Sequence, residues 1–379
     1  MILVVEPVFP NAHHAATNGT LLKAIRVAAG GEDVAFAAHP AHRDAVFQIL
    51  GETERQAYTH RDIEVLPAGG IRFRRFRSQA NTLLDLTKRL SPRLVVCLGT
   101  QPETLFALRL LVLAHPSLPA IAVLHGNLDN AVGWRSRDPR RRWFDDRASI
   151  RAAATSRRIQ FVVLDRTVRE AVLAQGLLPR DRTHVWPLAI PDTEIWDQPH
   201  RPDPAKLRIA FLGSAKVAKG FGDFAAITRA IAARSDRYEF SLIGALQDDF
   251  PAEAIAHIER PAGFMDRAAY LGRLRGIDYA CLPLRDDTYT LTVSGAILDA
   301  IAAQKPLIAL PTPAIRALFQ EGPAGFLCDD LESMAQAIGD IDRLADPVAY
   351  EQCRSTLRRV REGRRGTSLA EIVAPAIAK

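Results

Sequence analysis

Two lysines lie in a short segment that joins a predicted strand to a predicted helix. The segment runs from Gly213 to Gly220 and contains Lys216 and Lys219, with Ser214 directly after the first glycine. A glycine after a strand lets the backbone approach a ligand closely, and lysines beside a helix N-terminus neutralise phosphate charge. These residue types in this order predict a phosphate-binding corner, although any strand–loop–helix connection can carry lysines on its surface.

Hydroxyl-bearing side chains precede Gly295, where another helix is predicted to begin. The free backbone N–H groups and the dipole of a helix N-terminus favour a diphosphate. Asp299 lies one turn inside this helix, where its carboxylate could accept hydrogen bonds from a ribose. An ordinary capped helix with a surface aspartate is the alternative interpretation. The residues predicted to bind a nucleotide here are Tyr289, Thr292, Ser294, Gly295 and Asp299.

Other candidate residues follow predicted strands in the first half of the chain. His125 comes directly after a strand, and an imidazole suits proton transfer because its pKa lies near neutrality. Asp129 and Glu6 are the carboxylates nearest to strand ends. Any of these groups, or His13 or His14, could be a base that takes a proton from an acceptor hydroxyl, and we rank His125 and Asp129 ahead of Glu6.

Asn18, Gly19 and Thr20 open the first predicted helix and could present backbone N–H groups to a phosphate or an acceptor. A simple Asn18 N-cap is the equally good alternative. Asp286 and Asp287 could hold a divalent metal, but acidic residues are common in loops. We therefore predict no metal site and no cofactor.

The predicted strands and helices determine where the candidate site residues lie. Short apolar runs alternate with helical patterns, which is typical of a parallel sheet covered by helices on both faces. In the first half we predict strands at residues 2–5, 33–38, 94–98, 121–124, 161–164 and 185–188, and helices at residues 19–29, 101–113 and 167–174. Asn18 and Thr100 are the predicted N-caps, and Gly30 and Gly31 should end the first helix.

A proline-rich segment separates this half from a second one with the same pattern. Residues 191–204 contain four prolines, which interrupt helices and central strands and so predict a linker. Strands are then predicted at residues 207–212, 240–243, 279–283 and 307–310, and helices at residues 221–233, 268–275, 295–303 and 331–343. A helical, arginine-rich tail follows from Pro347.

The predicted architecture is α/β, with two Rossmann-like domains facing each other across a cleft and a helical tail. The predicted parts are residues 1–190, a linker at 191–206, residues 207–345 and a tail at 346–379, with a return of the tail to the first domain as one alternative. Open α/β sheets bind ligands at the carboxyl ends of their strands, and a cleft between domains is a favoured small-molecule site. A fold does not determine a reaction, so the function depends on the residues above.

The composition is that of a globular protein. Apolar residues make up 48% of the 379 and charged residues 24%, which allows a buried core in each of two domains. Four scattered cysteines have no metal-ligand spacing. No basic stretch precedes the first apolar run, and no run reaches the length of a transmembrane helix. We expect a cytoplasmic protein, with peripheral attachment to the inner face of the membrane as an alternative.

The net charge of +6 is concentrated in two arginine-rich segments. They run from Arg72 to Arg77 and from Arg135 to Arg147, and aromatic residues are interleaved with both. This combination is typical of surfaces that contact anionic membranes, and it also suits a lipid-linked or polyanionic acceptor. A solvated loop face is the alternative for either segment, and we predict no nucleic-acid partner.

The two phosphate-binding stretches resemble the donor-binding half of GT-B glycosyltransferases, specifically the large group of bacterial family-4-like enzymes. That family has a strand, a Gly-Arg-like corner and a Lys-Gly pair, and later a helix with an acidic-x7-Glu pattern before a Gly-Lys-Pro-type turn. The matching residues are Gly213, Lys219 and Gly220 in the first motif and Asp299, Ala300, Lys305 and Pro306 in the second. Residues 313–316 and 322–327 are similar to a loop and a strand of the family, and the N-terminal half fits more loosely.

Three positions depart from the family pattern. Ser214 stands where the family usually has an arginine for the diphosphate, so Lys216 or Lys219 would take that role. Leu291 stands at the first acidic position, and the second is Asp299 rather than Glu. In the family these acids contact the sugar and ribose of the donor, so the sugar and the retaining or inverting course stay open.

The resemblance implies a glycosyltransferase that moves a sugar from a nucleoside-diphosphate sugar to an acceptor on the first domain, without a metal. Bacterial polysaccharide, glycolipid or natural-product glycosylation is the expected setting. One alternative is a sugar-nucleotide epimerase, which would need more acidic and histidine side chains converging on one sugar. Another is a catalytically degenerate scaffold that binds nucleotide sugars. A periplasmic sugar receptor shares the twin fold but needs an export signal, which the sequence does not predict.

Overall fold

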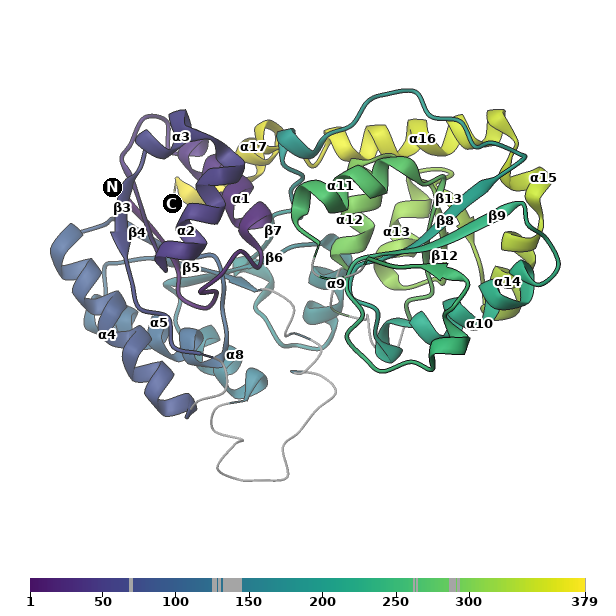
Figure 1. Ribbon diagram of the computed structural model, residues 1–379. Helices are drawn as coiled ribbons and strands as arrows, with labels where there is room; N and C mark the ends of the chain where they lie inside the picture. The colour runs from purple at the N-terminus through teal and green to yellow at the C-terminus, as the bar shows by residue number, and fades with distance from the viewer. Residues whose placement is uncertain are drawn as a thin grey trace. The chain divides into compact units, whose positions relative to one another are not determined.

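The computed structural model describes residues 1–67, 71–124, 128, 131, 145–261, 263, 265–285, 291 and 294–378. The chain divides into two compact units (Figure 1). The first comprises Met1–Thr193 and Arg364–Lys379, and the second comprises Glu194–Gly363. Within the described ranges, no helix combines the length and the apolar character that crossing a bilayer requires.

The first unit is built around a seven-stranded parallel sheet with the order β3-β2-β1-β4-β5-β6-β7. All residues of β1, β2, β4 and β5 are buried, because helices cover both faces of the sheet, and this explains why these strands are apolar except for Glu6 at the end of β1. The strands are β1 (Ile2–Glu6), β2 (Val34–Ala38), β3 (Thr59–Asp62), β4 (Leu94–Cys97), β5 (Ala120–Leu124), β6 (Ile159–Val163) and β7 (Thr183–Val185).

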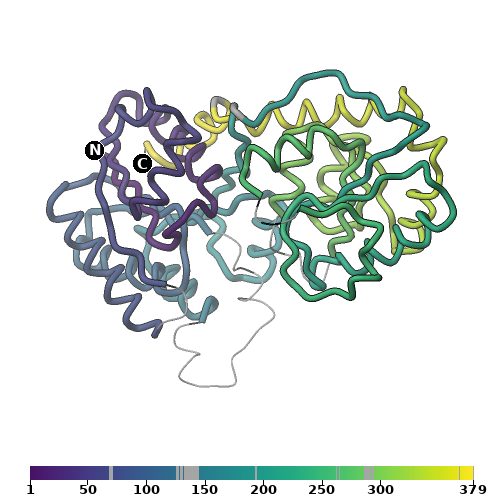
Figure 2. The backbone as a smooth tube through the Cα atoms, in the orientation of Figure 1, coloured from purple at the N-terminus to yellow at the C-terminus, as the bar shows by residue number. Residues whose placement is uncertain are grey.

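The C-terminal helix of the chain completes the first unit. This helix, α17 (Gly366–Ile377), packs against α1 (Ala15–Ala28), and Figure 2 shows the yellow C-terminal segment beside the purple N-terminal one. Ile190 and Arg365 also form a parallel bridge. The other described helices of this unit are α2 (Pro40–Leu50), α3 (Glu52–Gln56), α4 (Arg72–Leu90), α5 (Pro102–Ala114), α8 (Asp146–Ala154) and α9 (Arg166–Ala174).

The second unit has a six-stranded parallel sheet with the order β10-β9-β8-β11-β12-β13. Its strands are β8 (Leu207–Leu212), β9 (Tyr238–Ile243), β10 (Ile258–Glu259), β11 (Tyr279–Leu282), β12 (Leu307–Ala309) and β13 (Gly325–Leu327). Its described α-helices are α10 (Phe221–Ala232), α11 (Arg267–Gly276), α12 (Gly295–Ala302), α13 (Pro313–Gln320), α14 (Leu331–Gly339), α15 (Ile341–Leu344) and α16 (Pro347–Glu362). In both sheets the strand order reverses beside the first strand, which is where doubly wound folds bind ligands.

Two edge strands, one helix and one predicted loop differ here from the sequence prediction. β3 has the polar, half-exposed sequence Thr-His-Arg-Asp, so it lacks the apolar run of a central strand. The helix predicted at 331–343 is divided into α14 and α15, because Asp340 leaves helical geometry and its carboxylate caps the N–H of Arg343. The predicted closing strand at 185–188 lies at 183–185. Residues 313–316, expected as a loop, begin α13, which is capped by Thr312.

The predicted helix stop at Gly30 and Gly31 is confirmed, since both have positive φ angles directly after α1. The predicted N-cap at Thr100 is wrong by one residue. Gln101 caps α5 in a reciprocal arrangement with Thr104, while the Thr100 hydroxyl donates to the carbonyl of Val123.

Candidate functional site

The loop between β8 and α10 forms a tight corner at the carboxyl end of β8. Gly213 and Gly220 have φ angles of 89° and 76°, which glycine adopts without strain. A Cβ atom at Gly220 would lie 2.2 Å from the carbonyl oxygen of Pro283, directly after β11. A Cβ atom at Gly244, after β9, would lie 1.9 Å from the carbonyl oxygen of Gly213. The ends of β8, β9 and β11 therefore meet at the reversal of strand order.

Aromatic packing anchors this corner to the core of the second unit. Phe221, the first residue of α10, lies with its ring centroid 5.1 Å from that of Phe211 in β8. Phe224, one turn later, lies 5.8 Å from the same ring. Because all three side chains are fully buried, they fix the start of α10 against the strand and leave the loop between them at the surface.

Lys219, which the sequence predicts to bind phosphate, lies over the corner, and that role stays a prediction. Its Nζ lies 3.4 Å from Ser214 Oγ, and a Cβ atom on Gly213 would be 4.0 Å from it. Burial, and secondly the charge of Lys216, lowers the pKa of Lys219. No carboxylate of the described residues is among the charges that act on this amine. An amine held near a second cation, without a counter-ion in this part of the chain, attracts an incoming anion.

The start of α12 lies at the carboxyl edge of the same sheet, because β11, the preceding strand, pairs with β8. Ser294 is the N-cap and is buried, whereas Gly295 is exposed. Ser294 makes no side-chain hydrogen bond to the helix. The first-turn N–H groups of a helix have no intrahelical acceptor, so an exposed helix start can receive phosphate oxygens.

Asp299, predicted to contact a ribose, is held by two donors from α11. Its Oδ1 accepts a hydrogen bond from Arg267 at 2.7 Å, and its Oδ2 accepts one from the Tyr270 hydroxyl at 2.8 Å. Arg267 also donates to Glu194 at 2.9 Å. The Asp299 side chain is 16% exposed, so a ribose contact has to use the lone pairs that these donors leave. That role stays a prediction.

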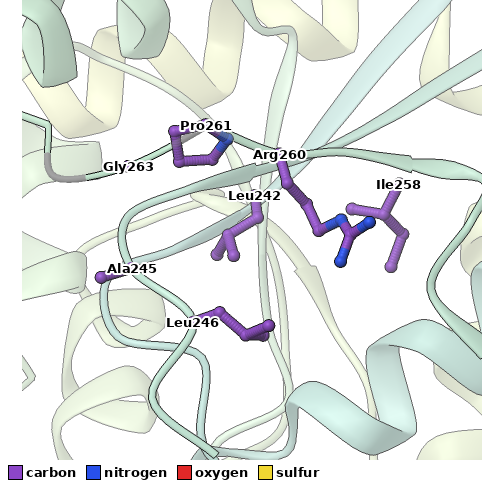
Figure 3. Close-up of a pocket in the computed structure, with 7 residues that line it drawn as sticks. All are labelled: Leu242, Ala245, Leu246, Ile258, Arg260, Pro261 and Gly263. Atoms are coloured by element: carbon purple, nitrogen blue, oxygen red, sulfur yellow. The ribbon is translucent and has the colours of Figure 1, made fainter. Parts of the chain in front are cut away.

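A cavity of about 670 Å³ adjoins the corner (Figure 3). The sequence does not predict this cavity. Its walls come from the ends of β9 and β10 and the loops that follow them. Most of the lining is apolar, and Arg260 contributes the only charged side chain among the described lining residues. The lining consists of Leu242, Ala245, Leu246, Ile258, Arg260, Pro261 and Gly263.

Backbone hydrogen bonds join this cavity to the lysine corner. Ala215 and Leu246 form a parallel bridge, and the N–H of Gln247 donates to the carbonyl of Ala215 at 3.1 Å. The N–H of Val217 donates to the Asp248 carboxylate at 2.7 Å. The cationic corner and the mainly apolar cavity are therefore two parts of one surface at the carboxyl edge of the sheet.

In the first unit, Glu6 is the centre of a buried hydrogen-bond chain. Its Oε1 accepts from the N–H groups of Val8 and Phe9, at 2.8 and 3.2 Å, and its Oε2 accepts from Asn18 Nδ2 at 2.7 Å. Asn18 Nδ2 also lies 3.0 Å from His42 Nε2. Burial raises the pKa of Glu6 to about 7 despite these three donors. The side chain is fully buried, so these contacts are those of a group that holds the loop after β1.

The prediction that Asn18, Gly19 and Thr20 open the first helix is wrong. α1 begins at Ala15 with His14 as its N-cap, and the N–H of Asn18 is bonded to the carbonyl of His14 at 2.9 Å. All three residues are buried inside the helix, and Asn18 is directed to the core because Glu6 requires a donor there. Their backbone N–H groups are therefore not presented to a ligand at a helix start.

Several predicted residues lie outside the described residues, and their roles stay predictions. They are His125, Asp129, Asp286, Asp287, Tyr289 and Thr292, together with most of the second arginine-rich segment.

The first arginine-rich segment is the beginning of α4, and one of its members is buried. Arg75 is 8% exposed, and its guanidinium donates to the buried Glu103 at 2.5 Å. Arg74 and Arg77 are exposed. Ile71, directly before the helix, is 76% exposed and Phe73 is 59% exposed, so apolar and cationic side chains share this surface.

Residues 206–342 match a family described as Glycosyl transferases group 1. No curated protein matches the sequence significantly. Sucrose-phosphate synthase from Thermosynechococcus elongatus has a similar structure, with a TM-score of 0.70 and 13% identity over 100% of this chain and 98% of that one. HepE from Anabaena, solved in complex with UDP-glucose, gives a TM-score of 0.66 and 13% identity over 100% of this chain and 99% of that one.

A UDP-N-acetylglucosamine 2-epimerase is also similar, with a TM-score of 0.60 and 13% identity over 99% of this chain and 95% of that one. At these identities the likeness is one of fold. It confirms the predicted class of two parallel α/β sheets with C-terminal helices.

Proposed function

We propose that the second unit, whose residues 206–342 match the glycosyl transferases group 1 family within a GT-B-like fold, binds a nucleoside-diphosphate sugar at the lysine corner. The sugar is then transferred to an acceptor on the first unit. The observation that supports this best is Lys219, which lies over a glycine corner without a carboxylate partner among the described residues.

The donor is proposed to extend from the corner into the adjoining cavity. The diphosphate contacts Lys219 and the N-terminus of α12, and the nucleobase enters the cavity beside Leu246. Apolar walls with one charged side chain suit a flat base, and the volume of about 670 Å³ is ample. HepE, which has the same fold, was solved with UDP-glucose, and this supports a nucleotide sugar as the donor class.

In the proposed transfer, an acceptor hydroxyl oxygen forms a bond to the anomeric carbon of the donor sugar. The bond between that carbon and the β-phosphate oxygen breaks, and the nucleoside diphosphate leaves. As this bond breaks, negative charge develops on the β-phosphate, where the Lys219 amine and the α12 dipole stabilise it. The acceptor proton requires a base, and His125 and Asp129 stay the preferred candidates. Complete burial of Glu6 makes direct contact with an acceptor less favourable.

A titration with nucleotides tests this proposal. We expect one nucleoside diphosphate, and its sugar conjugate, to raise the melting temperature, because a ligand that binds only the native state stabilises it. At a ligand concentration a hundred times Kd, the stabilisation is about 2.7 kcal/mol. The measurement is a thermal-shift series with uridine, guanosine, adenosine, cytidine and thymidine nucleotides. If no nucleotide shifts the transition, the protein does not bind this donor class and the degenerate-scaffold alternative gains support.

A variant separates binding in the cavity from binding elsewhere. Leu246 is 42% exposed, so Leu246→Ala should fold normally while removing part of the apolar wall. We expect nucleoside diphosphate affinity to fall about fivefold, which corresponds to about 1 kcal/mol of lost apolar contact. Val348→Ala, a 65%-exposed apolar position on α16, is the matched control. Equal affinities in both variants would mean that the base does not occupy this cavity.

The epimerase alternative rests on the fold likeness to a UDP-N-acetylglucosamine 2-epimerase. It is distinguished by incubating the protein with the nucleotide sugar that it binds, in the absence of an acceptor. An epimerase changes the sugar and keeps the nucleotide conjugate intact. A transferase leaves the conjugate unchanged, or slowly releases nucleoside diphosphate to water, until an acceptor is supplied.

We also propose that α4 brings the first unit to an anionic membrane, where a lipid-linked acceptor for polysaccharide or glycolipid synthesis would lie. Exposed Ile71 and Phe73 beside Arg74 and Arg77 support this, because such surfaces combine apolar insertion with attraction to lipid phosphates. Co-sedimentation with phosphatidylglycerol vesicles should fall at least threefold in Phe73→Ser, and high salt should reduce it further. Binding that is equal with phosphatidylcholine vesicles would contradict the electrostatic part.

A further inference from the structure

A second cavity lies in the second unit, at the opposite edge of the sheet from the lysine corner. Its volume is about 260 Å³, and it lies between the segment from Asp197 to Arg201 and helix α16. The two segments run side by side in Figure 1. His200 in the cavity wall bonds to Asp278 at 2.6 Å, and Asp278 directly precedes β11. The cavity is therefore at the amino edge of the sheet, away from the proposed donor.

Basic side chains outnumber acidic ones in its lining. His200, Arg201, Arg354 and Arg358 face it, together with the acidic residues Asp197 and Glu351. Two further basic residues are buried close to the wall, and burial lowers the pKa of one of them, Lys305, to about 7. Lys305 is fully buried and donates to the carbonyl of Arg275, while Arg361 is 1% exposed and pairs with Asp197 at 2.8 Å.

Arg354 carries a donor that the described residues leave unused. The residue is 2% exposed, and its Nε is buried without a hydrogen-bond partner in the described part of the chain. Its other nitrogens donate to Glu351 at 3.1 Å, to the carbonyls of Gln198 and His200 at 2.8 and 3.5 Å, and to Gln304 Oε1 at 3.3 Å. A buried guanidinium donor without an acceptor is costly, and the positive charge of this group beside the cavity favours an anion there.

The two acidic residues in the lining offset these arginines unequally. Asp197 is bonded to the buried Arg361 at 2.8 Å, and this hydrogen bond lowers the pKa of Asp197, so it stays in place. Glu351 is 54% exposed and lies 3.5 Å from Arg358, which is 43% exposed. Such a solvent-exposed pair contributes little, about 0–1 kcal/mol, so a more highly charged anion can displace Glu351. Planar guanidinium groups bind phosphate oxygens through paired hydrogen bonds.

We propose that this cavity binds a small phosphate-bearing anion at Arg354, Arg358 and His200, independently of the donor site. The volume admits one phosphate group with a few additional heavy atoms, which is below the usual range for whole nucleotide ligands. The ligand class is therefore inorganic phosphate or a small phosphomonoester.

The test is calorimetric titration of the full chain with inorganic phosphate at constant ionic strength, in a Lys219→Ala background that disables the lysine corner. We expect saturable binding that Arg358→Gln weakens about tenfold, through loss of a charge-assisted hydrogen bond. We expect Glu351→Gln to strengthen binding about threefold or more, because a competing carboxylate is removed. Both side chains are about half exposed, so these variants should fold.

Opposite changes from Arg358→Gln and Glu351→Gln separate a binding site from a purely structural cluster. A structural cluster would alter the melting temperature in both variants and leave phosphate affinity unchanged, and that result would overturn the proposal. Absence of phosphate binding in the Lys219→Ala background would overturn it as well. A parallel titration with glycerol 3-phosphate identifies the source: tighter binding than phosphate supports an ester, and equal binding supports inorganic phosphate.

Discussion

Lys219→Ala is expected to weaken nucleoside diphosphate binding by about tenfold to a hundredfold, which corresponds to about 1.5–3 kcal/mol for a hydrogen bond to a charged group. The amine lies beside Ser214 Oγ over the glycine corner, and burial together with the Lys216 charge lowers its pKa. An arriving phosphate would supply the counter-ion that the described residues do not provide. The substitution removes only a partly buried side chain, so the fold should be retained.

The measurement is the dissociation constant of the nucleoside diphosphate identified by thermal shift, together with kcat once an acceptor is known. Lys206→Ala is the matched control, because Lys206 is an exposed lysine of the same unit that pairs with Glu239 at 2.8 Å. Unchanged affinity in Lys219→Ala would remove this residue from the site, and Lys216 would then be the next lysine to test.

The central strands could be predicted because complete burial leaves a clear mark on a sequence. β8 lies at residues 207–212, the same bounds as the predicted strand. Edge strands leave no such mark, since one side faces solvent and only two to four residues pair. β10, at Ile258–Glu259, has a single buried residue, so neither its apolar content nor its length distinguishes it from a loop.

The two parts of the proposed donor site also differ in how well the sequence predicts them. The lysine corner is local, because Gly213, Lys219 and Gly220 lie within eight residues of one another, so their order in the chain reveals it. The cavity combines Leu242 from one strand with Ile258 from the next. Side chains of this type usually indicate core, and only the tertiary structure shows that they surround an open space.

Asn18 shows how a local preference can be overruled by a distant partner. Asparagine is a favoured N-cap, which predicts a helix start at this residue. The structure instead places Asn18 one turn inside α1, where its amide donates to Glu6, twelve residues earlier in the chain. A buried Oε2 of Glu6 without a donor would cost more than a lost cap, which favours the tertiary hydrogen bond over a helix start at Asn18.

Glu6→Gln is expected to remove a pH dependence from the stability of the first unit. Burial raises the pKa of Glu6 from 4.5 to about 7, so the native state holds a proton that the unfolded state has released between these values. The native state is therefore favoured below pH 4.5, and this contribution is lost as the pH rises through about 7. Between pH 5 and pH 8 the free energy of unfolding of the wild type should fall by about 2–3 kcal/mol more than that of the variant.

The structure also indicates how glutamine can be accommodated at this position. The new amide oxygen can accept from Val8 and Phe9, and the new NH₂ group needs an acceptor where Asn18 Nδ2 now donates. Asn18 Oδ1 is buried and has no partner among the described residues, so rotation of its amide supplies that acceptor.

Urea unfolding at pH 5 and pH 8 gives, for each protein, the change in the free energy of unfolding between the two pH values. Comparing this change between the wild type and the variant removes any cost of the substitution that does not depend on pH. Glu32→Gln is the control, because hydrogen bonding to Arg93 lowers the pKa of Glu32 and the group is ionised at both values. A wild type and Glu6→Gln pair that respond equally to pH would show that Glu6 is already ionised in the native protein. In that case the three donors, rather than burial, would determine its charge, and Glu6 would regain its place as a candidate base.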